Sequence, residues 1–460
     1  MSKKNLNSET RLKKNETIKA SLKATRAKRE LQDCCVVLFK ISESKTPVTT
    51  MKAGKRLFAE KRWMTNYVIG RSNDDTSFDV FKFEFGTTVV HKDKDFNDVT
   101  EPIMMGSQIK QSVVSDIRQS IRSMSALKKA GHKIGKLKFV TECNSIELKQ
   151  HKITYQITRH PKNKSKGKLK IQGIKLPFVI YGLQQLDEIG LPYEMANAKF
   201  LRRSDGYFVA VTLYVDKAEN QKRKMSNVKT DIYAFDAGCS ESYTRSDGKK
   251  CKCDVREPDQ LKKLQQKLEN QVKGSKRRDK TKLAIKRQYQ KLNNKKTDAA
   301  NKIFHQMMEA ETVVVQDEQI AGWQENGHGK AVTHSCLGRV KRKLETESKS
   351  SGRVIILNKW VPTTKLCTKC GKRHEMSLYD REFNCDCGVH AERDAHAAQN
   401  MVWFYKHNIG IGKDNNLTQD ELNKLIAEAI ASDNQLVDCQ EDINSGKSGT
   451  DSTINNARPG

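Results

Sequence analysis

The sequence predicts a multidomain α+β protein, in which a β-barrel with an inserted helical domain precedes an α/β domain with a cysteine-rich insertion. Three observations support this prediction. Short strand-like segments separated by Lys, Asn, Gly and Asp fill residues 134–230. Apolar strands and long charged helical segments alternate after residue 231. A chain of 460 residues is also longer than one hydrophobic core usually serves.

The charge balance indicates a polyanionic partner. The chain has 85 Lys and Arg residues against 55 Asp and Glu residues, a formal net charge of +30. An excess of this size, spread along the chain, attracts nucleic acid, and a merely basic soluble protein is the less favoured alternative. No segment approaches the ~20 apolar residues that span a bilayer, and the N-terminus has no apolar signal-peptide core. We therefore expect no membrane partner and a cytoplasmic location in a bacterial or archaeal cell, in association with the nucleoid.

The N-terminal half divides into an arm, a strand, helices and further strands. Residues 1–30 are polar and charged, which predicts a flexible basic arm or a lone helix. The run CCVVLFKI predicts a buried strand, and KRLFAEKRWMTNYVIG has apolar residues at helical spacing. A second helix is expected over residues 107–131. Its apolar face consists of Ile109, Val113, Val114, Ile117 and Ile121. Because one strand precedes the helices and several follow, the helices are expected to be inserted in the β domain.

The C-terminal half has α/β character. The strand IYAF ends at Asp236, and residues 256–310 have periodic leucines broken near KGSKRRDK, which predicts two antiparallel lysine-rich helices. A solvated hairpin and a nucleic-acid contact are both compatible with this charge. The tail from about Lys413 is polar and acidic, and we expect disorder there after one short helix.

Two pairs of cysteines indicate a metal site. Cys367 and Cys370 form CTKC, and Cys385 and Cys387 form CDC. Four thiolates suit one tetrahedral Zn²⁺ ion, and a closed site of this kind is structural. A glycine directly after each pair permits the tight turn of a zinc ribbon.

The other cysteines carry no such pattern. Cys251 and Cys253 form a lone C-x-C without a second pair nearby. Isolated cysteines are interpreted as small apolar residues. They are Cys34, Cys35, Cys143, Cys336 and Cys439.

Three acids follow or open predicted elements. Asp236 ends an apolar strand, Glu318 follows the run TVVV, and Asp394 opens a helical segment after the cysteines. Ligands gather where the strands of an α/β sheet end, and Mg²⁺ prefers carboxylate oxygens. Each acid alone is more simply a solvated strand end or a helix cap. Together they predict catalytic ligands for two Mg²⁺ ions.

The segments FDAG, VVVQDEQIAGW, PTTKLCTKCG with FNCDCG, and ERDAHAAQNM resemble, in that order, the split RuvC motifs and zinc ribbon of TnpB proteins. The compact type V CRISPR effectors look similar. The resemblance implies an RNase H-like α/β RuvC nuclease domain with an inserted zinc ribbon, after a wedge β-barrel that holds a helical recognition domain. The expected boundaries are 1–30 for the arm, 31–50 and 132–228 for the wedge, 51–131 for the recognition domain, 229–362 and 390–408 for the nuclease, 363–389 for the ribbon and 409–460 for the acidic tail.

The sequence departs from the family pattern at two positions. Gln316 stands where a glutamate is common. Since side chains of a strand repeat their facing every two residues, Glu318 is expected to face the same side as Gln316, and Asp317 the other side. Gln316 would then orient the glutamate or a water molecule. His396 stands where asparagine is usual, and a histidine on the helix surface is preferred over a metal or DNA contact.

The resemblance implies an Mg²⁺-dependent, RNA-guided DNA endonuclease that is favoured as a monomer. A guide RNA would pair with double-stranded target DNA beside a short flanking motif. A helix with four basic residues is a candidate for phosphate contacts, or a solvated surface. Its residues are Arg339, Lys341, Arg342 and Lys343. One alternative is a guided, repressor-like DNA-binding protein without cleavage, and a second is a transposon accessory protein that needs no RNA.

Overall fold

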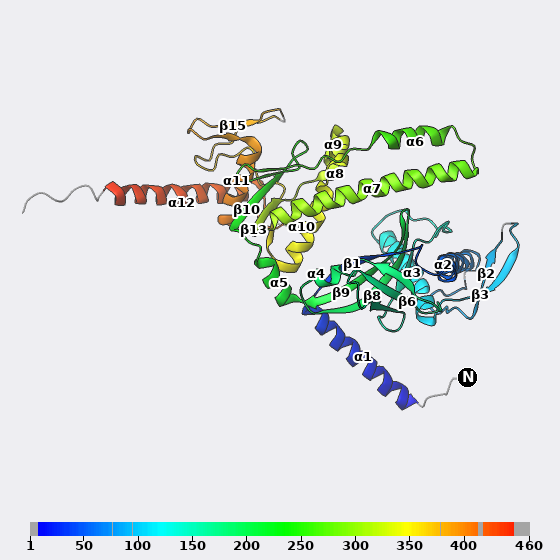
Figure 1. Ribbon diagram of the computed structural model, residues 1–460. Helices are drawn as coiled ribbons and strands as arrows, with labels where there is room; N and C mark the ends of the chain where they lie inside the picture. Colours follow the sequence, from blue (N-terminus) through cyan, green and yellow to red (C-terminus); the bar gives the residue numbers. More distant parts are fainter. Residues whose placement is uncertain (1–7, 76, 94, 378, 413–416, 446–460) are drawn as a thin grey trace, which may run out of the picture. The chain divides into compact units, whose positions relative to one another are not determined.

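The chain forms two compact units, residues 1–222 and residues 223–460. The computed structural model describes residues 8–75, 77–93, 95–377, 379–412 and 417–445. Figure 1 shows the elements in the order of the sequence. One unit is built on an antiparallel sheet and the other on a mixed sheet flanked by helices, so the predicted multidomain α+β class is confirmed.

The first unit contains a seven-stranded antiparallel sheet that is nearly closed. Its spatial order is β4-β8-β9-β1-β7-β6-β5. The strands are β1 (Gln32–Ile41), β4 (Ser145–Leu148), β5 (Tyr155–Arg159), β6 (Lys166–Ile171), β7 (Phe178–Tyr181), β8 (Tyr193–Arg203) and β9 (Gly206–Asp216). Strand β1 pairs with β9 and β7, which lie far along the chain. The prediction that helices are inserted between one strand and the rest of its sheet is therefore confirmed.

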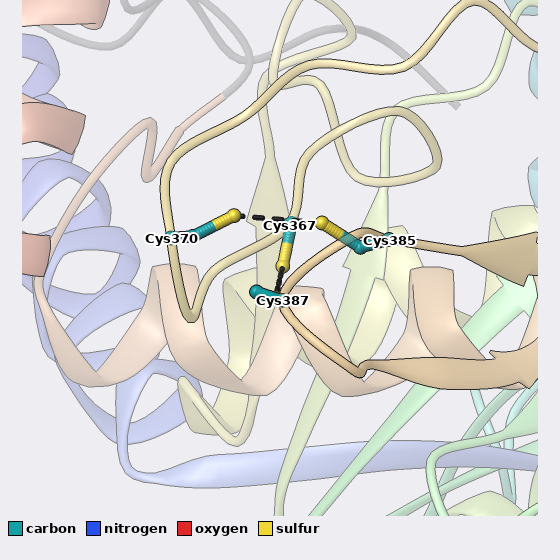
Figure 2. A group of neighbouring side chains, drawn as sticks. All are labelled: Cys367, Cys370, Cys385 and Cys387. Atoms are coloured by element: carbon teal, nitrogen blue, oxygen red, sulfur yellow. Dashed lines mark hydrogen bonds between the residues drawn. The ribbon is translucent and has the colours of Figure 1, made fainter.

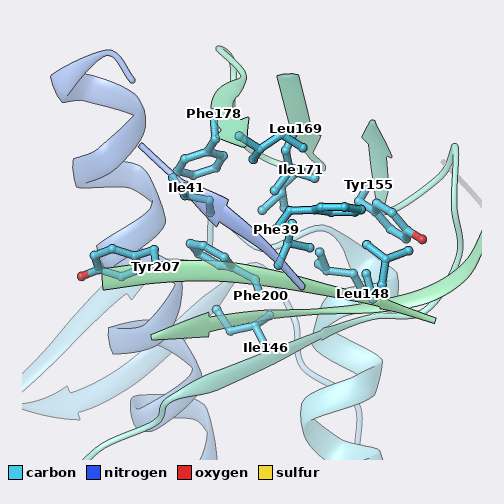
Figure 3. Close-up of a cluster of buried hydrophobic side chains, with 14 of the residues drawn as sticks. Phe39, Ile41, Ile146, Leu148, Tyr155, Leu169, Ile171, Phe178, Phe200 and Tyr207 are labelled. Carbon is cyan, nitrogen blue, oxygen red and sulfur yellow. The ribbon is translucent and has the colours of Figure 1, made fainter. Parts of the chain in front are cut away.

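The core of this sheet comes from strand alternation. Phe39 and Ile41, two residues apart on β1, are both fully buried and meet Phe178 and Phe200 from other strands (Figure 3). Tyr155 lies in the same cluster, and its hydroxyl donates a hydrogen bond to the carbonyl of Ala196, 2.9 Å away. This bond links the start of the end strand β5 to β8, the strand next to the other end of the sheet.

The segment after β1 is mostly helical, as expected. The elements of the first unit outside its main sheet are α1 (Ser8–Glu30), α2 (Val48–Asp74), β2 (Thr88–Lys92), β3 (Asp98–Pro102), α3 (Ser107–Lys129) and α4 (Gln185–Glu188), and α5 (Lys217–Met225) leads into the second unit. Four of the five predicted apolar residues of α3 are buried, and Ile121 is partly buried.

For the arm, the helix alternative is confirmed over residues 8–30, and residues 1–7 lie outside the described residues. Two other expectations for the first unit need correction. The helical insertion also contains a hairpin, β2–β3, because TVVHK is β-branched and pairs with DVTEP. The segment KLKFVTE is not a strand, since Phe139 is 61% exposed and its neighbours have no strand partner among the described residues.

The second unit contains a five-stranded mixed sheet in the order β12-β11-β10-β13-β14. Its strands are β10 (Thr230–Ala237), β11 (Tyr243–Arg245), β12 (Lys250–Cys251), β13 (Ala310–Gln316) and β14 (Val354–Leu357). The first three strands form an antiparallel meander, whereas β10, β13 and β14 run parallel. The predicted α/β character is thus confirmed, and the parallel strands end at one edge.

Helices cover both faces of this sheet. Phe235, Val313 and Val315 pack with α7 and α10, whereas Ala234 and Val314 pack with α11 and α12. The remaining elements are α6 (Asp259–Glu269), α7 (Lys276–Met307), α8 (Ile320–Trp323), η1 (Gln324–His328), α9 (Gly329–His334), α10 (Leu337–Ser351), β15 (Glu382–Asn384), β16 (His390–Glu392), α11 (Arg393–Lys406) and α12 (Gln419–Ser445). The predicted lysine-rich helices are α6 and α7. No helix in the described part of the chain has the length and apolar character of a membrane span.

The acidic tail contains the expected helix, but this helix is long, and the disorder expected after a short helix is wrong for residues 419–445. They form α12, whose Leu422, Ile426 and Ile430 are buried in the core beside α11. These residues are spaced four apart, so they form a stripe along one face of the helix despite the acidic composition. Residues 446–460 lie outside the described residues.

Candidate functional site

The parallel strands β10 and β13 place Asp236 and Gln316 side by side. Phe235 pairs with Val315 in the register, and both pack into the core under α7 and α10. Since neighbouring residues of a strand face opposite sides, Asp236 and Gln316 face the side covered by α11. Asp394 lies in the first turn of that helix. Sheet topology therefore brings a strand-end acid and a helix-start acid to one edge.

Electrostatics shows that the three predicted acids influence one another. Burial raises the pKa of Asp236 well above its ordinary value, and the negative charges of Asp394 and Glu318 raise it further. The Arg393 guanidinium acts against this rise. Burial also raises the pKa of Glu318, opposed by Lys341. The site thus brings acidic groups together at a partly buried place.

Arg393 supplies positive charge at the acidic site. Its guanidinium lies 3.0 Å from the carboxylate of Asp394, and both side chains are mostly buried. Arg393 also lowers the pKa of Asp236. Sequence reasoning missed this residue, although it directly precedes Asp394 in ERDAHAAQNM. The positive charge of Arg393 therefore partly neutralises the negative charge of these two acids.

The acids are not gathered around one point. Among the described residues, the four ribbon cysteines are the only group of three or more His, Cys, Asp or Glu side chains placed to hold a single metal ion. The acids come from three elements and repel one another, as the raised pKa of Asp236 reflects.

Gln316 faces the expected side but contacts a loop. Its Nε2 donates to the carbonyls of Asn358, 3.1 Å away, and Val361, 2.8 Å away. Its Oε1 accepts a hydrogen bond of 2.9 Å from Thr363. The side-chain amide is therefore committed to the loop that follows β14.

The alternation argument for Glu318 is wrong, because the strand ends at Gln316. The backbone N–H of Glu318 donates to the carbonyl of Gln316, 3.0 Å away, so the chain turns before the next strand position. Glu318 lies beside Tyr243, whose pKa its charge raises. Asp317 does face away as predicted, toward α10, where Lys341 binds it at 2.8 Å. Glu318 therefore comes near Asp236 because of this turn, and not because of strand periodicity.

The predicted basic helix, α10, does not present its four cations together. Arg339 donates to Asn293 and Thr297 of α7. Lys341 donates to Asp317 and to the carbonyl of Glu318. Lys343 lies over the ring of Phe304, and Arg342 is exposed. The Arg342 Nε donates to the carbonyl of Gly338, 3.1 Å away, so all four cations have partners within the protein. Phosphate contact by this group stays a prediction.

The structure brings the four predicted ribbon cysteines together (Figure 2). The sulfur atoms of Cys367 and Cys387 are 3.5 Å apart, as are those of Cys370 and Cys385. All four sulfurs lie within 4.8 Å of one another. A tetrahedral ion with bonds of ~2.3 Å to sulfur needs separations of ~3.8 Å, so this group could hold one metal ion.

Two turns shape the cysteine pairs. Gly371 and Gly388 have φ values of +79° and +88°, a left-handed conformation that favours glycine. Their backbone N–H groups donate to the carbonyls of Cys367 and Cys385. The predicted role of these glycines is confirmed. The pKa of Cys387 is lowered to about 7, mainly by a backbone hydrogen bond at Val389, which favours a thiolate.

His396 is buried, which corrects the expectation of a surface histidine. It is 4% exposed, and its ring stacks on Phe383 of β15 at 3.7 Å between centroids. Its Nε2 donates to the carbonyl of Leu366, 2.9 Å away. Burial lowers its pKa, which keeps the ring neutral. Its aromatic neighbour and its backbone partner together fix α11 against the ribbon.

Asn400 completes this contact and was also missed. Its Nδ2 donates to the carbonyls of Thr363 and Leu366, at 2.7 and 2.8 Å. A spacing of four residues places Asn400 on the same helix face as His396, and this is the signal that could have found it. The two residues tie the first turns of α11, where Asp394 lies, to the loop that Gln316 holds.

Among the described residues, the remaining cysteines belong to no group of three or more side chains placed to hold a metal ion. Cys251 and Cys253 are buried in the core near Cys336. Cys35 and Cys143 are half-buried, but Cys34 is exposed, so it is not a core residue. The side chain of Cys439 lies outside the described residues.

Comparison with known proteins agrees with the sequence motifs. Residues 338–401, which span nearly all of α10, the four-cysteine segment and most of α11, match the family model described as "Cas12f1-like, TNB domain". A protein of Streptomyces pristinaespiralis named "Putative RNA-guided DNA endonuclease" is 29% identical over 180 residues, 38% of this chain and 45% of that protein. The chain thus matches less than half the length of this relative.

Solved structures give a broader but more distant match. The cryo-EM structure of a Cas12f1-sgRNA-target DNA complex has a TM-score of 0.43 and 13% identity, over 77% of this chain and 81% of that chain. The family model and the curated relative confirm the predicted resemblance to TnpB-like compact type V effectors.

The hydrogen bonds of Gln316 predict a specific response to Gln316→Glu. A carboxylate would replace a double donor and face two carbonyl oxygens, so the metal-free protein should lose about 1–3 kcal/mol of stability. Thermal unfolding with a chelator measures this loss. Gln324→Glu, an equal charge change at an exposed position, serves as the control. Equal melting temperatures for Gln316→Glu and the unmodified protein would contradict the described contacts.

The raised pKa of Asp236 predicts that Asp236→Asn stabilises the metal-free protein at neutral pH. A carboxyl whose pKa is higher in the folded state binds its proton more tightly there, so ionised Asp236 destabilises the fold above its unfolded pKa. The gain from the substitution should shrink as the pH falls toward 3.8, the ordinary value. Unfolding curves from pH 4 to pH 8 with a chelator test this. A lower melting temperature for Asp236→Asn at pH 8 would refute it.

Proposed function

We propose that the protein is an RNA-guided DNA endonuclease whose hydrolytic site is formed by Asp236, Glu318 and Asp394. One observation carries this proposal: three acids from β10, the β13 turn and α11 interact at the edge of a sheet, next to a four-cysteine ribbon. The matched family model and the name of the curated relative support the reaction class.

The acidic site fits divalent cations. A buried carboxylate whose pKa rises through burial and neighbouring negative charge has too little positive charge around it. Magnesium takes oxygen ligands and uses few carboxylates per ion, so acids spread around two ions suit it. Asp236, whose pKa both other acids raise, would hold the cations together with Glu318 and Asp394.

The residues of the chain divide the work at this site. When bound, two Mg²⁺ ions supply an activated water and stabilise the leaving oxygen of a phosphodiester. Asp236 offers a half-buried carboxylate whose pKa is raised by burial and by the other two acids. Arg393 limits repulsion between Asp236 and Asp394. Lys341 holds the turn after β13 through Asp317 and the Glu318 carbonyl, which fixes the approach of Glu318.

The four cysteines would hold one structural Zn²⁺ ion. Four sulfurs at near-tetrahedral separations leave no open position for a substrate, so this ion stabilises the fold. The stacked pair Phe383 and His396 connects the ribbon to α11. A folded ribbon therefore contributes to the position of Asp394, two residues before His396.

Guide RNA and double-stranded DNA with a short flanking motif are the proposed partners, and such an activity would place the protein at the nucleoid. The hairpin α6–α7 presents long lysine and arginine side chains to solvent, while α7 buries only a few small or apolar residues against the unit. Exposed cations along a helix suit a phosphate backbone, and base pairing by the guide supplies the sequence specificity.

The alternative is guided DNA binding without cleavage. Gln316 supports this alternative because its amide donates to the carbonyls of Asn358 and Val361 and provides no carboxylate ligand for a metal ion. Cutting that requires Gln316→Glu would establish this alternative. A transposon accessory protein that works without RNA is the second alternative, and RNA that copurifies with the protein would argue against it.

Loss of each proposed ligand should abolish cutting. The purified complex with its guide RNA is expected to cut matching DNA in Mg²⁺, and Asp236→Ala, Glu318→Gln and Asp394→Ala should each lower the rate by about 100-fold or more. Asp317→Asn should have less than about a tenfold effect because Asp317 faces α10. Asp254→Ala, at an exposed position, is the control for charge loss. RNA-dependent binding without any cutting would favour the repressor-like alternative.

The ribbon predicts one zinc ion per chain. Metal analysis of the purified protein should show this stoichiometry, and Cys370→Ser should lower both the zinc content and the melting temperature. Cys34→Ser, at an exposed cysteine outside the group, should change neither. A chain that unfolds at the same temperature with and without zinc would show that the ribbon does not depend on the metal.

A further inference from the structure

The loop after β14 exposes its largest side chain. Residues Asn358, Val361 and Thr363 are buried, with exposed fractions of 8%, 4% and 3%, whereas Trp360 is 67% exposed. A tryptophan normally contributes to stability by leaving water, and its neighbours in this loop do so. The indole of Trp360 is thus exposed to solvent although the residues around it in the loop are buried.

This tryptophan lies on a fixed backbone. Gln316 donates to the carbonyls on both sides of it, at Asn358 and Val361. The backbone N–H of Trp360 donates to Oδ1 of Asn358, 2.9 Å away, and the N–H of Asn358 donates to the carbonyl of Gly410 at 2.8 Å. A rigid support of this kind reduces the entropy lost when a ligand contacts the ring.

A cation lies beside the ring. The Nζ atom of Lys359 is 4.7 Å from the centre of the Trp360 ring, and both side chains are exposed. An aromatic face for a base and an ammonium group for a phosphate are the two elements of sites that bind single-stranded nucleic acid.

The pair lies near the acidic site. Leu357 pairs with Gln316, which lies beside Asp236 on the next strand. With strands ~4.8 Å apart, the ends of β14 and β10 are ~10 Å apart, and three residues of chain add at most ~10 Å. Trp360 therefore lies within ~20 Å of Asp236.

We propose that Trp360 and Lys359 form a stacking platform that holds unpaired DNA bases beside the acidic site. The choice of DNA rests on the proposed function, whereas the stacking chemistry rests on the exposed ring, its fixed loop and the adjacent cation. The platform aligns a strand so that a nearby phosphodiester reaches Asp236. Gln316 is then a positioning residue for the platform.

Photocrosslinking tests the location directly. The purified protein with its guide RNA is irradiated with oligothymidine of 15 nucleotides that carries 5-iodouracil, and the crosslinked peptide is identified by mass spectrometry. The expected adduct is on Trp360. Adducts elsewhere with none on the peptide that contains Trp360 would overturn the proposal. Crosslinking only to labelled guide RNA would also overturn it and would assign the ring to RNA.

Substitutions separate stacking from charge. By fluorescence anisotropy, Trp360→Leu should weaken binding of the oligonucleotide by roughly 5- to 150-fold, the range for one stacked base, whereas Trp360→Phe should retain most of the affinity. Lys359→Gln should lower the slope of log affinity against log salt by about 0.7, and Trp360→Leu should leave that slope unchanged. Tyr379→Leu, at a 90% exposed tyrosine of the same unit, is the control. Equal affinities for Trp360→Leu, Trp360→Phe and the unmodified protein would overturn stacking.

The two proposals fail separately. Guided, Mg²⁺-dependent cutting that Trp360→Leu leaves unchanged would support the nuclease and overturn the platform. Loss of oligonucleotide binding in Trp360→Leu, in a protein that never cuts DNA, would support the platform and overturn the nuclease. Because Trp360 is exposed, its substitution should leave the melting temperature unchanged, which is measured alongside.

Discussion

The candidate site depends on the burial of one carboxylate. The parallel register of β10 and β13 fixes Asp236 at the end of an apolar strand, where it is half-buried and two other acids add negative charge. An ionised group in such a place destabilises a metal-free fold, and proteins retain such groups mainly where a cation or a reaction uses them. Arg393 neutralises part of the charge, and the remainder is what divalent cations would balance.

A series of polar contacts connects the acidic site to other parts of the second unit. Gln316 binds the loop after β14 through Asn358, Val361 and Thr363, and Asn400 binds the carbonyl of Thr363 from α11. Strand β13, the loop after β14 and the helix of Asp394 are thus connected by buried and partly buried hydrogen bonds. In a buried network each unmade bond is costly, so the parts hold one another in place. Compared with a glutamate, the glutamine at position 316 adds no negative charge to the site and makes these hydrogen bonds instead.

The sequence predicted most elements and the members of the site, but not the contacts within it. Strands and helices with clear periodicity, such as β1, α3, α7 and β13, lie where their patterns indicate. The paired cysteines meet because two short turns suffice. By contrast, the turn at Glu318, the burial of His396 and the packing of α12 depend on tertiary contacts that no local pattern contains. The amphipathic stripe of α12 was present in the sequence, but its acidic composition outweighed it in the prediction.

The ribbon and the acidic site use different chemistry because they meet different demands. Four thiols within 4.8 Å form a closed, soft donor set, suited to an ion that stays and stabilises the fold. The acids come from separate elements and have hard oxygen donors. Such donors suit a cation that retains some of its water ligands and can bind and release a substrate. The stack of His396 on Phe383 joins the two, since both the ribbon and Asp394 bear on the first turns of α11. A metal ion bound by the four cysteines would therefore affect the acidic site by fixing the position of α11, although the two sites share no ligand.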